Sequence, residues 1–345
     1  MSSLVFYSVI PKCKRPVLLQ TSQQKGGEWR QNVTKLLIFR VRSIIIYKNY
    51  YFGGIMWRDL LVREGTPYVG VFGIAYDGGA SVGKGAALAP SVLRDRSRWL
   101  PPYTCRGELI PEGVLDLGDV SGFDAASAEE KLCEALKTGF AIMLGGDHSS
   151  SILTESAYRR IKGGRVGLIH VDAHADFCDE YEGSRFSHAC PCKRAMDGGY
   201  APEDFSLIGI RSLEAAEVAI VNDPRVTTVF ADDYRRMGTE GVLNMLTEKY
   251  RHYDSIYLSF DIDALDPGFA PGTGTPESFG LTPVEVRDLI TGIIKALPVG
   301  MMDLVEISPP LDSGDITVWA GLKILLEVFK CISDKKCNFK GEESC

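Results

Sequence analysis

Seven short runs of apolar, strand-forming residues recur along the chain. They lie at residues 68–76, 140–146, 166–174, 205–211, 226–232, 255–263 and 301–308. The runs are rich in Val, Ile, Leu, Phe and Met and mostly do not alternate with polar residues, a pattern typical of strands buried on both faces. They therefore predict a sheet that helices cover on both sides.

Amphipathic stretches separate several of these runs, for example at residues 127–139, 238–251 and 282–297. The third opens with Thr282, Pro283 and Glu285, which is a favourable helix start. Strands that alternate with helices, without a Pro/Gly/Ser-rich linker or an internal repeat, predict one domain. We expect a three-layer α/β/α fold with a doubly wound, mainly parallel sheet over residues 56–333, followed by a C-terminal tail at 334–345.

The first 55 residues differ from the rest, because they hold nine Lys or Arg and only one acid. A basic, acid-poor segment is compatible with a transit peptide, whereas a signal peptide fits badly because Arg40 and Arg42 interrupt the apolar stretch. Gly53 and Gly54 precede Met56, and their codons could form a bacterial ribosome-binding site. We therefore expect translation to start at Met56 and residues 1–55 to be a non-native or disordered extension.

The remaining 290 residues carry 29 basic and 44 acidic side chains, a net charge of −15. Such a balance disfavours nucleic acid as a partner and favours a cationic ligand. No apolar run reaches the eighteen or so residues of a membrane span. The nine cysteines form no zinc or thioredoxin spacing, and an odd, scattered set is typical of free thiols in a cytoplasmic protein.

Acidic and histidine residues gather at the ends of four predicted strands, in "LGGDH", "VDAHAD", "SFDID" and "DLVEIS". In doubly wound folds ligands bind beyond the carboxyl ends of the strands, so these segments are expected to share one rim of the sheet. Side chains at positions i, i+2 and i+4 of a strand point to one side. Asp172, His174 and Asp176 therefore start on one side, as do Asp261 and Asp263.

With His148, these residues supply four carboxylates and two imidazoles, a donor set that suits a hard or borderline divalent ion, Mn²⁺ above all. Four carboxylates balance the charge of two such ions. Each motif alone is as readily a helix cap or a turn, but their coincidence at successive strand ends favours a metal centre. His170 lies deeper on the same face and is expected to be a core residue or to support a ligand.

The segments "GGDHS", "DAHAD", "SFDIDALDPGFAPGTGTPE" and "DLVEISPP" resemble the signature segments of the ureohydrolase family, the arginases and agmatinases, over about residues 68–330. The resemblance implies a three-layer fold, a binuclear manganese site and hydrolysis of a guanidino compound to urea and an amine. The implied ligands of one ion are His148, Asp172, Asp176 and Asp261. Those of the other ion are Asp172, His174, Asp261 and Asp263.

The resemblance also implies that Glu306 receives the substrate guanidinium and that His188 shuttles a proton. These roles suit the chemistry. Two neighbouring ions lower the pKa of water and supply hydroxide. Asp176 or Asp263 can orient that hydroxide and pass its proton toward the leaving amine. A planar carboxylate such as that of Glu306 can meet a guanidinium with paired hydrogen bonds.

The loop "FCDEYEGSRFSHACPCKRA" bears on the choice of substrate. It lacks the Asn and Ser pattern with which arginases hold an α-amino acid, and it is more similar to the loops of agmatinases. Its acids Asp179, Glu180 and Glu182 are expected to face a distal ammonium or, alternatively, solvent. Trp319 stands where a small residue is expected, so a shortened pocket is a competing expectation.

We therefore expect an enzyme that hydrolyses agmatine to putrescine and urea, with two Mn²⁺ per chain; Ni²⁺ or another divalent ion is an alternative. Guanidinobutyrate, guanidinopropionate and free guanidine are alternative substrates, and arginine is less favoured. Two other classes stay open, a single-metal amide hydrolase of the deacetylase type and a non-catalytic metal-binding regulator. The family resemblance further suggests a homo-oligomer, a trimer or hexamer, in the cytoplasm.

Overall fold

The structure is a computed structural model that describes residues 18–25, 28–35 and 57–342. The chain divides into two compact units, residues 1–52 and 53–345. In the first unit, β1 (Leu18–Lys25) and β2 (Glu28–Lys35) form an antiparallel pair. Met56 lies outside the described residues, so the expectation that translation starts there stays a prediction.

The second unit contains an eight-stranded sheet with the order β4-β3-β5-β10-β9-β6-β7-β8, in which every neighbouring pair is parallel. Its strands are β3 (Val69–Ala75), β4 (Val114–Ser121), β5 (Ala141–Leu144), β6 (Val166–Val171), β7 (Phe205–Ile210), β8 (Thr227–Phe230), β9 (Ser255–Phe260) and β10 (Val299–Leu304). The predicted parallel sheet is confirmed, and all seven predicted strands are present.

The edge strand β4 is the one that the apolar pattern missed. Its sequence, VLDLGDVS, is mostly half-buried or exposed. An edge strand pairs on one side only and needs no continuous apolar run.

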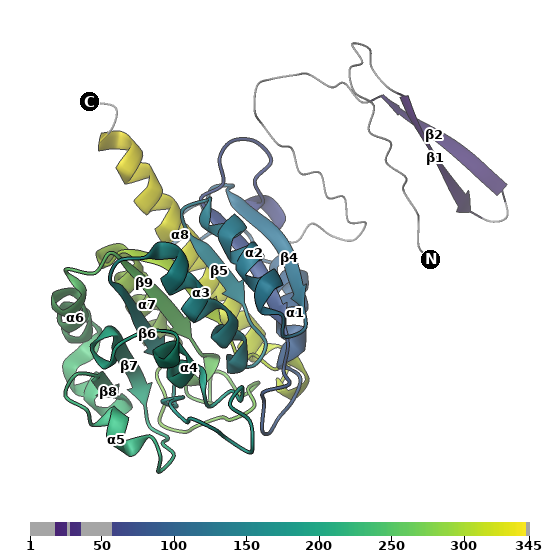
Figure 1. Cartoon of the computed structure of the whole chain (residues 1–345). Helices are drawn as coiled ribbons and strands as arrows, with labels where there is room; N and C mark the ends of the chain where they lie inside the picture. Colours follow the sequence, from purple (N-terminus) through teal and green to yellow (C-terminus); the bar gives the residue numbers. More distant parts are fainter. Residues whose placement is uncertain (1–17, 26–27, 36–56, 343–345) are drawn as a thin grey trace. The chain divides into compact units, whose positions relative to one another are not determined.

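Helices cover both faces of the sheet, as Figure 1 shows. The α-helices are α1 (Ala89–Ser97), α2 (Ala125–Leu136), α3 (Ile152–Lys162), α4 (Pro191–Asp197), α5 (Val218–Val221), α6 (Ala231–Tyr250), α7 (Pro283–Ala296) and α8 (Ile316–Glu342). Short 3-10 helices are η1 (Arg58–Leu60), η2 (Ala86–Leu88), η3 (His148–Ser151), η4 (Pro202–Asp204), η5 (Ile262–Ala264) and η6 (Pro309–Leu311). The helix α8 passes beyond residue 333, where the tail was predicted to begin.

Alternating strand residues fill two separate cores. In β5, Ile142 and Leu144 pack into the core that α1, α6, α7 and α8 cover. Ala141 and Met143 point to the opposite face and pack into the core beneath α2, α3 and α4. This alternation gives the three-layer arrangement, because each strand contributes side chains to both helical layers.

The α7 helix begins as its sequence predicts. The Thr282 side chain accepts from the Glu285 backbone N–H, and the Glu285 side chain accepts from the Thr282 backbone N–H. Such a capping box satisfies two of the free amide groups at a helix start. Within the described residues, no helix is long and apolar enough to cross a membrane.

Candidate metal centre and substrate cavity

The four strands that carry the predicted motifs are neighbours at the middle of the sheet, in the order β5-β10-β9-β6. Asp172 follows β6, Asp261 follows β9 and Glu306 lies two residues beyond β10, while His148 opens η3 after β5. The carboxyl ends of these parallel strands therefore bring residues that are far apart in sequence to one rim, as predicted.

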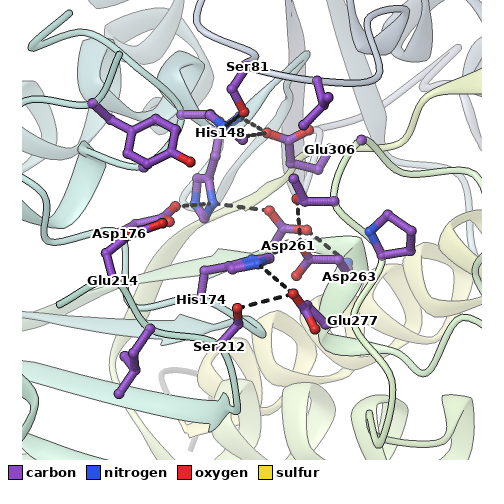
Figure 2. Close-up of a pocket in the computed structure, with 18 of the residues that line it drawn as sticks. Ser81, His148, His174, Asp176, Ser212, Glu214, Asp261, Asp263, Glu277 and Glu306 are labelled. Atoms are coloured by element: carbon purple, nitrogen blue, oxygen red, sulfur yellow. Dashed lines mark hydrogen bonds and ion pairs between the residues drawn. The ribbon is translucent and has the colours of Figure 1, made fainter. Parts of the chain in front are cut away.

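His148 lies at the centre of the first group of donors, which we call the deep cluster: His148, Asp172, Asp176 and Asp261. The His148 Nδ1 atom lies 3.0 Å from a carboxylate oxygen of Asp172 and 3.0 Å from one of Asp176. An Asp261 oxygen lies 3.1 Å from the same nitrogen. Figure 2 shows the side chains of Asp176 and Asp261 on either side of His148.

The second group, which we call the outer cluster, comprises Asp172, His174 and Asp263. Its donor atoms lie within 4.8 Å of one another. The His174 Nδ1 atom is 3.1 Å from Asp263 Oδ2 and 3.5 Å from Asp172 Oδ1. Asp172 thus presents one oxygen to each cluster, which is the arrangement expected of a bridging carboxylate.

Two buried atoms of the deep cluster show that it fits a cation. His148 Nδ1 and Asp172 Oδ2 are fully buried and make no hydrogen bond of good geometry with any residue that the structure describes. An unsatisfied buried polar group costs about 1–3 kcal/mol. A divalent ion between these atoms would satisfy both, and the mixture of carboxylates and imidazoles suits Mn²⁺ or a similar ion.

The electrostatics also favour a cation. Burial raises the pKa of Asp261 well above its usual value, and the charges of Asp263 and Asp172 raise it further. Burial lowers the pKa of His148, but its three carboxylate neighbours outweigh burial and hold that pKa well above the usual range. Crowded like charges are costly, and positive charge between them relieves the repulsion.

His170 is fully buried directly beside the deep cluster. Its ring stacks on that of His148 with a centroid separation of 4.9 Å, and its Nε2 lies 3.0 Å from Asp172 Oδ2. That approach lacks hydrogen-bond geometry, and among the described residues neither His170 nitrogen has a hydrogen-bond partner. His170 lies within β6, and Asp172 follows the end of that strand, so His170 is the deeper of the two, as predicted.

Glu306 occupies a constrained position beside the deep cluster. Its backbone adopts a left-handed conformation, with φ of 63°, which few non-glycine residues adopt. The Glu306 backbone N–H donates to the Gly146 carbonyl oxygen at 2.8 Å. Gly146 must be glycine, because an added Cβ would lie 1.7 Å from the Tyr76 carbonyl oxygen.

His188 bridges Glu306 and Ser81 across the cavity. Its Nδ1 atom lies 3.3 Å from Glu306 Oε1, and its Nε2 atom lies 2.8 Å from Ser81 Oγ. Burial lowers the pKa of His188, but the hydrogen bond to Glu306 and its charge raise that pKa above the ordinary value overall. The structure thus brings the two residues together, as their predicted roles require.

A cavity of about 360 Å³ opens above both clusters. Its walls come from the loops after β3, β6, β7 and β9. The lining residues besides the metal donors include Ser81, Val82, Tyr181, His188, Ser212, Leu213, Glu214, Glu217, Thr275, Glu277 and Glu306.

A model of the arginase family matches residues 67–330 of the chain. The chain belongs to the arginase family.

Individual relatives agree with this family assignment. The chain is 32% identical over 271 residues to guanidinobutyrase from Pseudomonas aeruginosa, covering 74% of this chain and 83% of that protein. It is also 32% identical over 284 residues to agmatinase from Neisseria meningitidis serogroup A, covering 77% and 87%. The solved structure of proclavaminate amidino hydrolase from Streptomyces clavuligerus is 30% identical, with a TM-score of 0.71 over 82% of this chain and 98% of that one. This arginase-family member is therefore a hydrolase of guanidino compounds.

Of the two expectations for the acids of the 179–182 loop, a distal ammonium or solvent, their positions agree with solvent. Neither Asp179 nor Glu182 lines the cavity of this arginase-family hydrolase. The Asp179 carboxylate is instead paired with the guanidinium groups of Arg185, at 3.0 Å, and Arg194. Both acids are exposed at the surface, so the expected contact with a distal ammonium is not supported by their positions.

Trp319 does not line the cavity either. It lies in α8 and packs against the core that α1, α6, α7 and α8 cover. The competing expectation, that its ring shortens the pocket, is therefore corrected.

Other acids take the place of those predicted. Glu214 follows β7, and Glu277 belongs to the "PGTGTPE" segment after β9. Figure 2 shows Glu277 beside His174 and Ser212, with Ser212 Oγ 3.1 Å and His174 Nε2 3.8 Å from Glu277 Oε1. The acidic end of "PGTGTPE" was a visible signal for Glu277, whereas the sequence around Glu214 carried none.

Proposed function

We propose that this arginase-family hydrolase converts agmatine and water to putrescine and urea. The observation that carries the proposal is the charge of the cavity wall. Glu214, Glu217 and Glu277 line it, and within the described part of the chain no lysine or arginine does. A substrate with a cationic distal end is favoured in such a cavity, and one with a distal carboxylate is repelled.

The deep and outer clusters would hold two Mn²⁺ ions, or two Ni²⁺ or other divalent ions. We assign His148, Asp172, Asp176 and Asp261 to the first ion and Asp172, His174, Asp261 and Asp263 to the second. Such a pair of ions supplies Lewis acidity and hydroxide at neutral pH. The four carboxylates would compensate the charge of two divalent ions.

Glu306 would receive the guanidinium. Its Oε1 atom already accepts from the His148 backbone N–H at 2.8 Å, so the carboxylate is held in one orientation beside the deep cluster. The remaining acceptor positions of Glu306 point toward the cavity that it lines. Paired hydrogen bonds from a planar guanidinium would place its carbon over the two clusters.

Proton transfer completes the reaction. Asp176 and Asp263 lie at the two clusters and would orient the attacking water and accept its proton. His188 would deliver a proton to the nitrogen that leaves as the amine. Its ring is half-buried between Glu306 and Ser81, within reach of a guanidinium bound to that glutamate.

A guanidino carboxylic acid is the second candidate substrate. The specific observation in its favour is that Tyr181, whose hydroxyl can donate to a carboxylate, also lines the cavity, beside Ser81 and Ser212. A guanidinobutyrase and an agmatinase are equally similar to the chain, at 32% identity each, so similarity does not separate the two candidates. Arginine is less favoured, because it adds an α-carboxylate to an acidic cavity.

Release of urea from each candidate tests the proposal. Manganese-loaded enzyme would be assayed with agmatine, 4-guanidinobutyrate, 3-guanidinopropionate, arginine and guanidine under the same conditions. We expect agmatine to give the highest kcat/KM. A higher value for 4-guanidinobutyrate would transfer the proposal to the guanidino acids, and absence of urea from every compound would reject it.

Three further assignments remain predictions. A trimeric or hexameric assembly and a cytoplasmic location follow from the family resemblance and the sequence composition. The proposal that residues 1–55 are a non-native extension is tested by the intact mass of protein made from the native gene. A mass that includes residues 1–55 would contradict it.

A further inference from the structure

A buried hydrogen-bonded chain runs from the deep cluster into the sheet. The His148 Nε2 atom lies 2.9 Å from Ser259 Oγ, and Ser259 Oγ donates to Asp303 Oδ1 at 2.9 Å. All three side chains are 1% exposed or less. Ser259 lies in β9 and Asp303 in the neighbouring strand β10. This series of hydrogen bonds therefore connects His148 of the deep cluster to the middle of the sheet.

Four donors converge on Asp303. Besides Ser259, the Phe260 backbone N–H donates to Oδ1 at 3.0 Å. On the other oxygen, Ser151 Oγ and Tyr257 OH both donate to Oδ2 at 2.7 Å. A carboxylate with every oxygen so occupied acts as an acceptor only. The single hydroxyl hydrogen of Ser259 is therefore directed at Asp303.

This direction determines the tautomer of His148. Because the Ser259 hydrogen points to Asp303, only lone pairs of Ser259 face the imidazole, and the His148 Nε2 atom must carry a hydrogen. A histidine that binds a metal ion is the neutral imidazole, which has one N–H. The lone pair of His148 is then left on Nδ1, the atom that faces Asp172, Asp176 and Asp261 at 3.0–3.1 Å.

We propose that Asp303, acting through Ser259, is a positioning residue that fixes His148 as the Nε2–H tautomer and so strengthens divalent-metal binding at the deep cluster. The inference rests on the proposed function, in which His148 Nδ1 is a ligand. In the opposite tautomer, a hydrogen on Nδ1 would occupy the direction in which the ion binds. Loss of such a supporting group typically weakens metal binding by about 10- to 100-fold.

Ser259→Ala tests the inference, because it removes the link between Asp303 and His148 while leaving all six donors. Mn²⁺ binding to metal-free protein would be measured by calorimetry. We expect about a tenfold or greater loss of affinity at one of two sites. The matched control is Tyr257→Phe, which also removes a hydroxyl donor to Asp303 but on Oδ2, outside the chain to His148. We expect its two affinities to stay within about threefold of the wild type.

Thermal unfolding separates positioning from a general structural role. If Ser259 had only a general structural role, its loss would lower the melting temperature of metal-free and Mn²⁺-loaded protein alike. Weaker metal binding would instead reduce the rise in melting temperature that Mn²⁺ produces. We expect the reduced increase for Ser259→Ala and restoration by Ser259→Thr, which keeps the hydroxyl. Wild-type affinities and an unchanged Mn²⁺-induced increase in Ser259→Ala would overturn the inference.

A measurement on the wild-type chain covers the case in which Ser259→Ala does not fold. In Zn²⁺-loaded protein, which is diamagnetic, nitrogen NMR of the histidines reports which ring nitrogen carries the hydrogen. The His148 signals would be assigned by their loss in His148→Gln. Hydrogen on Nε2 supports the inference and hydrogen on Nδ1 overturns it. Failure of the wild-type chain to bind Mn²⁺ would instead reject the proposed function itself.

Discussion

Glu306 and His148 are joined by a hydrogen bond, in which the His148 backbone N–H donates to Glu306 Oε1 at 2.8 Å. The same oxygen lies 3.3 Å from His188 Nδ1. One carboxylate oxygen thus links the backbone of a proposed metal ligand, the proposed guanidinium acceptor and the proposed proton donor. Glu306 also has φ of 63°, a backbone conformation that few non-glycine residues adopt.

Replacement of Glu306 by Gln should abolish turnover and leave the metal content unchanged. The amide removes the charge that pairs with the guanidinium but none of the six proposed ligands. The expected loss exceeds about 3 kcal/mol, the scale for breaking a buried charge pair, which is more than a hundredfold in kcat/KM. Urea release and elemental analysis check both parts. Near-normal turnover would place the guanidinium elsewhere.

Substrate preference should follow the acids of the cavity wall. Glu214→Gln removes a wall carboxylate that makes no hydrogen bond or ion pair in the described part of the chain, and it should lower kcat/KM for agmatine about fivefold. A contact with an ammonium in a partly solvated cavity is worth about 1 kcal/mol. Guanidine, which has no distal ammonium, should be unaffected. Glu182→Gln is the control, because Glu182 is exposed and outside the cavity.

Metal binding should release protons and strengthen as pH rises. In the metal-free protein, burial lowers the pKa of His148 and His174, but neighbouring carboxylates outweigh burial and raise both well above the ordinary value. Both imidazoles therefore carry a proton at neutral pH that an ion must displace. Calorimetry in buffers of different ionisation enthalpy should show that metal binding releases at least one proton per protein chain. The affinity for Mn²⁺ should be higher at pH 8.5 than at pH 6.5. Affinity independent of pH would contradict this.

The number of ions should be two. Elemental analysis of active, manganese-loaded enzyme should give about two ions per chain. Asp263→Asn weakens the outer cluster only and should reduce the count toward one while activity is lost. Full activity with a single ion would refute the assignment of two clusters.

Loss of the Ser81 hydroxyl should impair proton delivery. Ser81→Ala removes the hydrogen bond at 2.8 Å to His188 Nε2, whose net worth is about 0.5–1.5 kcal/mol. We expect kcat to fall about three- to tenfold and KM to change little. Ser91→Ala is a matched control in an exposed turn of α1, where the hydroxyl donates to the Leu88 carbonyl oxygen. Equal effects of the two variants would mean that Ser81 does not act through His188.

The layered fold and the donor clusters could be predicted from the sequence for one physical reason. A strand buried on both faces requires a continuous run of apolar residues, and the residue that follows the strand lies at the carboxyl-end rim of the sheet. Asp172 and Asp261 follow such runs directly, so their convergence needs only the parallel order of the strands. The edge strand β4 lacks the apolar run and was missed.

The cavity wall could not be predicted in the same way. The sequence left open whether Asp179 faces the substrate or solvent, and it did not indicate that Arg185 and Arg194 pair with it. Periodicity does not reveal which partner a loop side chain meets. Glu277 reaches the cavity from a segment about one hundred residues later, a proximity that depends on the packing of separate loops.

The proposed metal ligands and the cavity wall lie on different parts of the fold. The clusters stand immediately after the central strands, where a displaced main chain would disturb both packed cores. Much of the wall, including Ser81, Glu214 and Glu277, stands on loops after β3, β7 and β9. Loops in general tolerate substitution and insertion better than the strands that they connect. Substrate range can therefore diverge during evolution by loop replacement, while the hydrolytic machinery is inherited intact.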